Sequence, residues 1–200
     1  QNGQWRFEAA ATQLMVGAGG DMRVILAPAI ATDEEFESGT LGRLLPRAGN
    51  WAAQTNRVIG GAWSIEQPDA GLYYGIACLD LPVDGDYEFT FDAMLTGGSG
   101  YHIGIIDGID DNWRESHWAW MRGGSSLDLY VEQIGSPYSK PLPFTPVLNQ
   151  VYHFRFVARR GWREYWIDGR YLGGVPVDGP FAGSVGIATY RSSAVFDNLR

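Results

Sequence analysis

The chain has 200 residues, which is enough for one domain whose hydrophobic core needs no disulfide or metal in order to fold. Its 15 Lys and Arg residues and 23 Asp and Glu residues give a formal net charge of −8, which argues against a sequence-independent nucleic-acid binder and against adsorption to anionic membranes. The longest apolar run, residues 24–31, is far below the roughly 20 residues of a transmembrane helix, so no membrane insertion is expected. With 27 Gly, 10 Pro and 14% aromatic residues, the composition favours strands and turns.

Residues 1–32 differ in character from the rest of the chain. The stretch 8–16 has a plausible helical pattern, and the Gly-rich segment 17–20 separates it from the apolar segment 22–30. That apolar segment is too hydrophobic to remain a solvated tail. We expect residues 1–32 to be either the first strand of the main domain or an arm that pairs with a neighbouring subunit and mediates self-association.

Residues 33–200 form the predicted main domain. From about residue 72 onward, apolar and polar residues alternate with a period of two, and Gly-, Asp- and Pro-rich turns interrupt the alternation. This pattern is typical of an all-β protein, and two facing antiparallel sheets are the simplest way to bury so many strands. The predicted strands are 72–79, 87–95, 101–106, 116–122, 127–133, 152–159, 163–167, 184–190 and 194–199.

Three parts of this domain resemble motifs of known families. The first part combines Glu-Phe-Glu-Ser-Gly at 35–39 with Gly-Gly-Ala-Trp-Ser-Ile at 60–65. The second is the predicted hairpin 152–169, which ends in Tyr-Trp-Ile-Asp-Gly, and the third is 183–199, which contains Val-Phe-Asp-Asn. In this order they resemble the concanavalin A-like β-sandwich families, namely laminin G-like domains, sugar-binding modules and sugar-hydrolase domains. The resemblance implies a two-sheet antiparallel jelly roll, but these motifs are mainly scaffold and do not carry an activity.

The same resemblance implies a metal. Many sugar-binding modules of this kind hold a structural calcium between a carboxylate near the start of the domain and one near its end. By that resemblance, Glu37 and Asp197 are the candidate calcium ligands in this chain. Calcium needs six to eight oxygen ligands, so backbone carbonyl groups would have to supply the others.

The carboxylates give little support for catalysis. A glycoside hydrolase of this fold would carry a Glu-x-Asp-x-x-Glu or Glu-x-Asp-x-Glu run, which places acid and nucleophile on one face of a strand. No such run occurs, and the acidic clusters 33–37 and 107–111 are typical of solvated turns. If the chain is nevertheless an enzyme, Glu115 and Asp128 are the expected catalytic pair.

Strand parity predicts a polar sheet face. Ile103 and Ile105 set the buried phase of their strand, so His102 points the other way. The pair Trp118 and Trp120 is expected in the core, with a sugar platform as the alternative, and this phase turns His117 outward. Planar hydrogen-bonding groups beside an aromatic ring suit a sugar, although a plain solvated face or a zinc site made by the three His residues would use the same positions. The predicted ligand-binding residues are His102, His117, Asp128, Tyr130, His153 and Arg155.

Three functions remain open from the sequence. The first is a secreted, non-catalytic carbohydrate-recognition module that binds a glycan on this polar face at the cell surface or outside the cell. The second is a structural subunit of an extracellular assembly or filament, with residues 1–32 making the subunit contacts. The third is a glycoside hydrolase of the same fold.

Overall fold

The computed structural model describes residues 7–16, 22–30, 32–109, 116–123, 128–132, 138–159, 161–176 and 182–200. The secondary structure of these residues consists of β-strands, as the composition predicts, and none of them belongs to a helix long and apolar enough to cross a membrane. The residues divide into two compact units, 1–33 with Arg200 and 34–199.

The first unit contains a hairpin. Strands β1 (Phe7–Val16) and β2 (Met22–Ile30) pair antiparallel in a two-stranded sheet, with one register shift between Ala11 and Gln13. The helix expected at 8–16 is therefore wrong. Alanine has the highest helix propensity, but this preference is small per residue, and antiparallel pairing with β2 overrides it.

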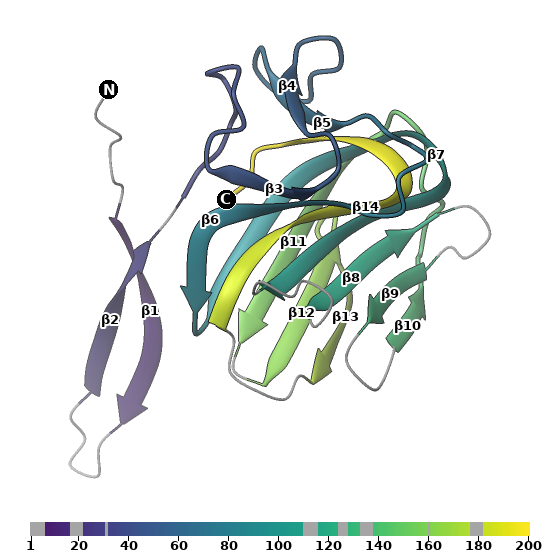
Figure 1. The fold of residues 1–200 in the computed structure, drawn as a ribbon. Helices are drawn as coiled ribbons and strands as arrows, with labels where there is room; N and C mark the ends of the chain where they lie inside the picture. The colour runs from purple at the N-terminus through teal and green to yellow at the C-terminus, as the bar shows by residue number, and fades with distance from the viewer. Residues whose placement is uncertain are drawn as a thin grey trace. The chain divides into compact units, whose positions relative to one another are not determined.

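The second unit is a two-layer sandwich (Figure 1), in agreement with the predicted fold class. The first layer has the strand order β10-β9-β8-β7-β14-β6-β3, and the second has the order β13-β12-β11-β7-β14-β5-β4. All of these pairs are antiparallel. The strands are β3 (Leu44–Ala48), β4 (Ala52–Gln54), β5 (Ser64–Gln67), β6 (Gly75–Asp84), β7 (Tyr87–Ile109), β8 (His117–Arg122), β9 (Asp128–Glu132), β10 (Tyr138–Pro141), β11 (Val151–Arg159), β12 (Trp162–Ile167), β13 (Arg170–Pro176) and β14 (Ala182–Asp197).

Two long strands, β7 and β14, belong to both layers. The first half of β7 pairs with β11 in the second layer, and its second half pairs with β8 in the first layer. The segment 97–100 separates the predicted strands 87–95 and 101–106, but it lies inside β7, where this strand passes from one layer to the other. Gly98 has a φ of 112°, and a Cβ atom there would lie 2.3 Å from the Arg191 carbonyl oxygen, so only glycine lets the two bending strands approach.

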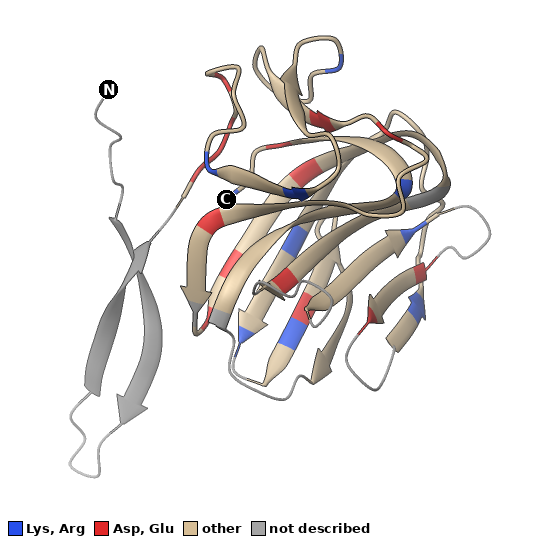
Figure 2. Ribbon diagram, viewed as in Figure 1, with Lys and Arg blue, Asp and Glu red and all other residues tan. Residues whose placement is uncertain are grey.

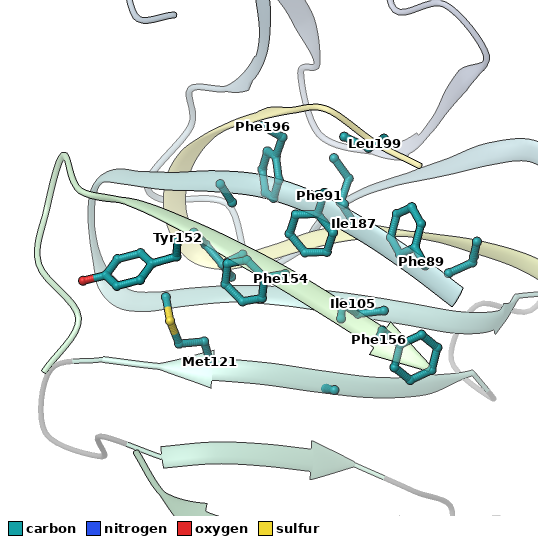
Figure 3. Packing of buried hydrophobic residues seen from close by; sticks show 14 of the residues in the cluster. Phe89, Phe91, Ile105, Met121, Tyr152, Phe154, Phe156, Ile187, Phe196 and Leu199 are labelled. Atoms are coloured by element: carbon teal, nitrogen blue, oxygen red, sulfur yellow. The ribbon is translucent and has the colours of Figure 1, made fainter. Parts of the chain in front are cut away.

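The core between the layers contains aromatic residues from neighbouring strands of the second layer (Figure 3). Phe91 and Phe154 are cross-strand partners whose rings stack 4.7 Å apart at 5°. The ring centroid of Phe196, from the Val-Phe-Asp-Asn motif, lies 5.9 Å from that of Phe91. Each of these rings is buried, and burial of one Phe side chain stabilises a fold by roughly 1.5–3 kcal/mol.

One charged cluster is buried between the layers. Arg163 on β12 is fully buried, and its Nε donates to Asp107 Oδ2 on β7 at 2.8 Å. The Tyr87 hydroxyl donates to the same oxygen at 3.0 Å, and His117 Nδ1 lies 3.8 Å from the other. Asp107 is thus a buried strand residue and not part of a solvated turn, while residues 110 and 111 lie outside the described ranges.

Candidate ligand-binding site

An aromatic cluster covers the outer face of the first layer. Along β8, Ala119 and Met121 contact the core between the layers, whereas Trp118 and Trp120 pack on the opposite face with Ile76 and Cys78. Both Trp side chains are buried in a hydrophobic cluster, as expected, but this cluster lies on the outer face of the first layer and not between the layers. Both faces of β8 are apolar, so the period-two pattern could not say which one faces the second layer.

The rings of this cluster contact one another closely. Trp118 and Trp120 stack at 5.2 Å and 15°, and Tyr74 lies over them with its centroid 5.4 Å and 6.4 Å away. Tyr190 lies 5.3 Å from Tyr74, and His102 lies 5.1 Å from Tyr190. The two Trp side chains are buried, while the Tyr and His rings remain partly exposed and form the surface.

A hollow of about 210 Å³ opens among these rings. It combines flat aromatic groups with hydroxyl, imidazole, guanidinium and carboxylate groups, which is the mixture that fixes the orientation of a small polar ligand. The residues that line it are Tyr74, His102, Trp120, Arg122, Tyr130, Glu132 and Tyr190.

Arg122 is held in place at one side of the hollow. Its Nε donates to Asp128 Oδ1 at 2.6 Å, and its guanidinium lies 4.1 Å from the centre of the Tyr130 ring. Ser139 also donates to the Asp128 carboxylate. Burial raises the pKa of Asp128, but hydrogen bonds from Arg122 and Ser139 outweigh it and leave the pKa below its ordinary value. The ion pair therefore remains charged.

Tyr74 and Tyr190 of the hollow stay protonated at neutral pH. Burial, together with the negative charge of Glu132, raises the pKa of the Tyr74 hydroxyl. A hydrogen bond with Tyr73 and burial raise the pKa of Tyr190. Both phenols can therefore donate as well as accept hydrogen bonds, as a sugar hydroxyl requires.

The predicted ligand residues do not share one face. His102 and Tyr130 line the hollow, and Asp128 lies beside it with its oxygens engaged by Arg122 and Ser139. His117 lies near the buried Asp107, because the Trp residues of β8 take the outer face.

The other two predicted ligand residues lie on the opposite layer. They belong to β11 of the second layer, where His153 Nδ1 is 2.7 Å from Asp92 and Arg155 donates to Glu88 at 2.7 Å. Each does point outward as predicted, but strand parity cannot tell which of the two sheets a strand joins. Figure 2 shows such acidic and basic positions interspersed along the strands. Glu115 lies outside the described residues.

Several residues of the hollow were missed by the sequence interpretation. Tyr74 precedes β6 and Tyr190 ends the first-layer part of β14, so their meeting depends on long-range pairing. Arg122 and Glu132 carry a local signal, since they share the outward parity of Trp120 and Tyr130 on the paired strands β8 and β9. Correct placement of Trp120 would have identified Arg122, and the parity that Leu129 and Val131 set already turns Glu132 outward.

Both predicted calcium ligands accept hydrogen bonds from the segment 60–64. Glu37 accepts hydrogen bonds from the Ala62 N–H at 2.9 and 3.0 Å, and Asp197 Oδ2 accepts from the Gly60 N–H at 3.0 Å and the Ser64 hydroxyl at 2.8 Å. Burial raises the pKa of Asp197. Among the described residues, no group of three or more His, Cys, Asp or Glu side chains is placed to hold a metal. Both carboxylates thus accept hydrogen bonds from N–H and O–H groups of this segment.

Comparison with known proteins gives a fold. No family model and no curated protein matches the sequence. Cellulose induced protein, Cip1, is similar with a TM-score of 0.64 at 16% identity, over 85% of this chain and 96% of that one. Carbohydrate binding module CBM66 from Bacillus subtilis has a TM-score of 0.61 at 17% identity, over 78% of this chain and 93% of that one. Domain 4 of AbnA, a GH43 extracellular arabinanase from Geobacillus stearothermophilus solved in complex with arabinotriose, has a TM-score of 0.52 at 14% identity. This match covers 84% of this chain and 89% of that one.

These similarities confirm the expected resemblance at the level of fold. The second unit has a β-sandwich fold similar to that of these proteins. Identities below 20% carry the architecture and no residue roles.

Proposed function

We propose that the chain is a secreted, non-catalytic carbohydrate-binding module that binds a glycan on the outer face of its first layer. The observation that carries the proposal is the hollow in which Tyr74, Tyr130 and Tyr190 surround His102 and the anchored Arg122. Flat rings pack against the apolar faces of a sugar, and the polar groups bind its hydroxyls. The descriptions of CBM66 as a carbohydrate binding module and of the AbnA domain as bound to arabinotriose support this proposal.

Glycan binding is tested by substitution in the hollow. The wild-type protein is first screened on immobilised neutral polysaccharides. The affinity for a polysaccharide that binds is then measured for wild type and for the variants Tyr190→Ala and Tyr130→Ala. We expect each variant to weaken binding about fivefold, since an aromatic contact contributes on the order of 1 kcal/mol. Tyr171→Ala is the matched control, because Tyr171 is 52% exposed on the second layer. Equal losses in all three variants, or no binding to any glycan, would contradict the proposal.

Hydrolysis is tested separately. Asp128 is paired with Arg122 and has a lowered pKa, which does not suit a general acid that must hold a proton at neutral pH. We therefore expect no new reducing ends when the chain is incubated with β-glucans, galactans and arabinans. Turnover that disappears in both Glu115→Gln and Asp128→Asn would identify a glycoside hydrolase instead.

A second candidate function is self-assembly through the N-terminal unit. The hairpin β1–β2 is a sheet of two strands, and an isolated two-stranded hairpin is marginally stable in water. Its apolar sequence favours a second copy of the hairpin as a partner. The test is the molar mass in solution with and without residues 1–32.

Calcium binding by Glu37 and Asp197 stays a prediction of the resemblance. Thermal unfolding in excess calcium and in a chelator measures it directly, because a ligand that binds only the folded state raises Tm. A chelator-sensitive Tm that Glu37→Gln abolishes would support a structural calcium. An unchanged Tm would contradict it.

A further inference from the structure

The aromatic groups continue beyond the hollow in a row that crosses the strands. Tyr130 on β9 is the cross-strand partner of Trp120 on β8, and His102 on β7 is the partner of Tyr190 on β14. The ring centroids of His102 and Trp120 are 6.1 Å apart, and those of His102 and Tyr190 are 5.1 Å apart. Since neighbouring strands lie about 4.8 Å apart, the row from β9 to β14 covers roughly 14 Å.

The row ends on Tyr73, which lies outside the hollow. Its ring is 4.8 Å from Tyr190 and 4.9 Å from Tyr74, in edge-to-face contacts. The Arg191 guanidinium lies 4.9 Å from the Tyr73 ring centre and 5.6 Å from that of Tyr190. The backbone N–H of Arg191 donates to the Leu72 carbonyl oxygen at 2.9 Å, which ties the loop of Tyr73 to β14.

Tyr73 is therefore both fixed and accessible. It is 52% exposed although two tyrosine rings and one guanidinium surround it. A large aromatic side chain held in this way costs little conformational entropy when a ligand packs on it. Beside it, Arg191 offers the planar donors of a guanidinium.

The hollow by itself is small. Its volume of about 210 Å³ is below the roughly 300–1,000 Å³ of pockets that enclose a whole drug-sized ligand. A ligand that filled only the hollow would leave Tyr73 and Arg191 unused.

We infer that the ligand is an extended saccharide chain that lies across β9, β8, β7 and β14, with one sugar in the hollow and a neighbouring sugar on Tyr73 and Arg191. This inference rests on the proposed glycan binding and names the class of ligand, an oligosaccharide or polysaccharide segment and not a single terminal sugar. The saccharide lies perpendicular to the strands because the row of aromatic rings crosses them in that direction.

An array that carries one- to six-sugar members of neutral glucan, fructan, arabinan, mannan, xylan and galactan series tests the length dependence. We expect signal on members of three or more sugars and at least tenfold weaker signal on the monosaccharides. Equal signal on a monosaccharide and on the longer members of its series would overturn the inference while leaving glycan binding intact. Absence of signal on every series would overturn both.

Calorimetric titration of the best series with Tyr73→Ala then tests the second contact zone. The variant should weaken binding of the six-sugar member about three- to tenfold and leave the shortest binding member unchanged. Tyr171→Ala, on the second layer, should change neither. If Tyr73→Ala binds the six-sugar member with wild-type affinity, the inference of an extended ligand is contradicted. If Tyr190→Ala binds both the shortest and the six-sugar member with wild-type affinity, the proposed function itself is contradicted. An unchanged Tm of Tyr73→Ala verifies folding, since an exposed side chain contributes little to stability.

Discussion

Gly104 lies directly across from Trp120 in the β7–β8 pair and gives the indole ring its place on the first layer. A Cβ atom at this position would lie 2.4 Å from Trp120 Cε3 and 2.9 Å from the Ala119 carbonyl oxygen. The ring therefore packs flat on bare backbone, and the other rings of the hollow pack on it. Residue choice at a single position thus supports a surface that several strands build.

We expect Gly104→Ala to destabilise the fold by about 1–3 kcal/mol, because the added methyl group forces Trp120 or the β8 backbone to move. Urea unfolding measures the change, and glycan titration shows whether the hollow is lost with it. Gly71→Ala is the control, since a Cβ atom there would meet only Asp69 Oδ1, at 3.4 Å. A Gly104→Ala variant as stable as Gly71→Ala would show that the ring has room to shift.

The Arg122–Asp128 pair gives a pH dependence with a definite sign. Asp128 has a folded-state pKa below its unfolded value, so it binds fewer protons when folded and stabilises the protein above the unfolded pKa of about 4. This stabilisation is lost as the pH falls through the lower, folded pKa. We expect Asp128→Asn to be less stable than wild type at pH 7, with the difference shrinking as the pH falls below about 4. A difference independent of pH would show that the charge of Asp128 does not stabilise the fold.

At the scale of elements, strands β7 and β12 are joined across the sandwich by Asp107 and Arg163. Both side chains are buried, so removal of one leaves the charge of the other in the core. We expect Asp107→Leu or Arg163→Met alone to cost about 3–5 kcal/mol, and the double variant to recover much of the loss. Chemical denaturation of the three variants measures this coupling.

The exposed pair Glu88 and Arg155 provides the comparison. Its double variant Glu88→Gln/Arg155→Met should change the free energy of unfolding by less than about 1 kcal/mol. Additive losses in Asp107→Leu and Arg163→Met would mean that the two residues stabilise the core independently.

The elements that the sequence predicted correctly are those with local signals. β8, β11 and β12 lie within a residue or two of their predicted bounds, and the turn Asp168-Gly169 has both residues at positive φ. Strands β3, β4 and β13 at the sheet margins were not predicted. Strand β4 has three residues, which is too short to show a period, and Pro or Gly residues interrupt the alternation in β3 and β13. The segment 97–100 was misplaced because glycine marks a close approach of bent strands as readily as a turn.

At the scale of the whole molecule, the fold class followed from composition, spacing and three scaffold motifs, whereas the site did not. His102 and Tyr130 were found because Ile103, Leu129 and Val131 set an unambiguous parity. The rest of the hollow depends on which strands join which layer, and that is decided by pairings between β7, β14 and their neighbours far apart in sequence. Local alternation contains no information about those partners.

At the same scale, the number of chains in the functional molecule depends on what the hairpin β1–β2 pairs with. The hairpin β1–β2 has nine paired positions and an apolar sequence, and two strands alone do not bury enough surface to be stable. If the hairpin pairs with a second copy, the full chain should form an oligomer or filament whose mass falls to that of a monomer when residues 1–32 are removed.

Light scattering coupled to size-exclusion chromatography distinguishes the outcomes, with glycan binding as a check that the sandwich remains folded. A truncated chain that binds glycan as a monomer, from a full chain that is larger, supports self-assembly through the hairpin. A truncated chain that precipitates at every concentration shows instead that the hairpin covers apolar surface of its own sandwich. Burial of the apolar residues 22–30 against a partner or against the sandwich is favourable, so their removal must change either the subunit number or Tm. Equal subunit number and equal Tm in the full and truncated chains would therefore contradict both self-assembly and packing on the same sandwich.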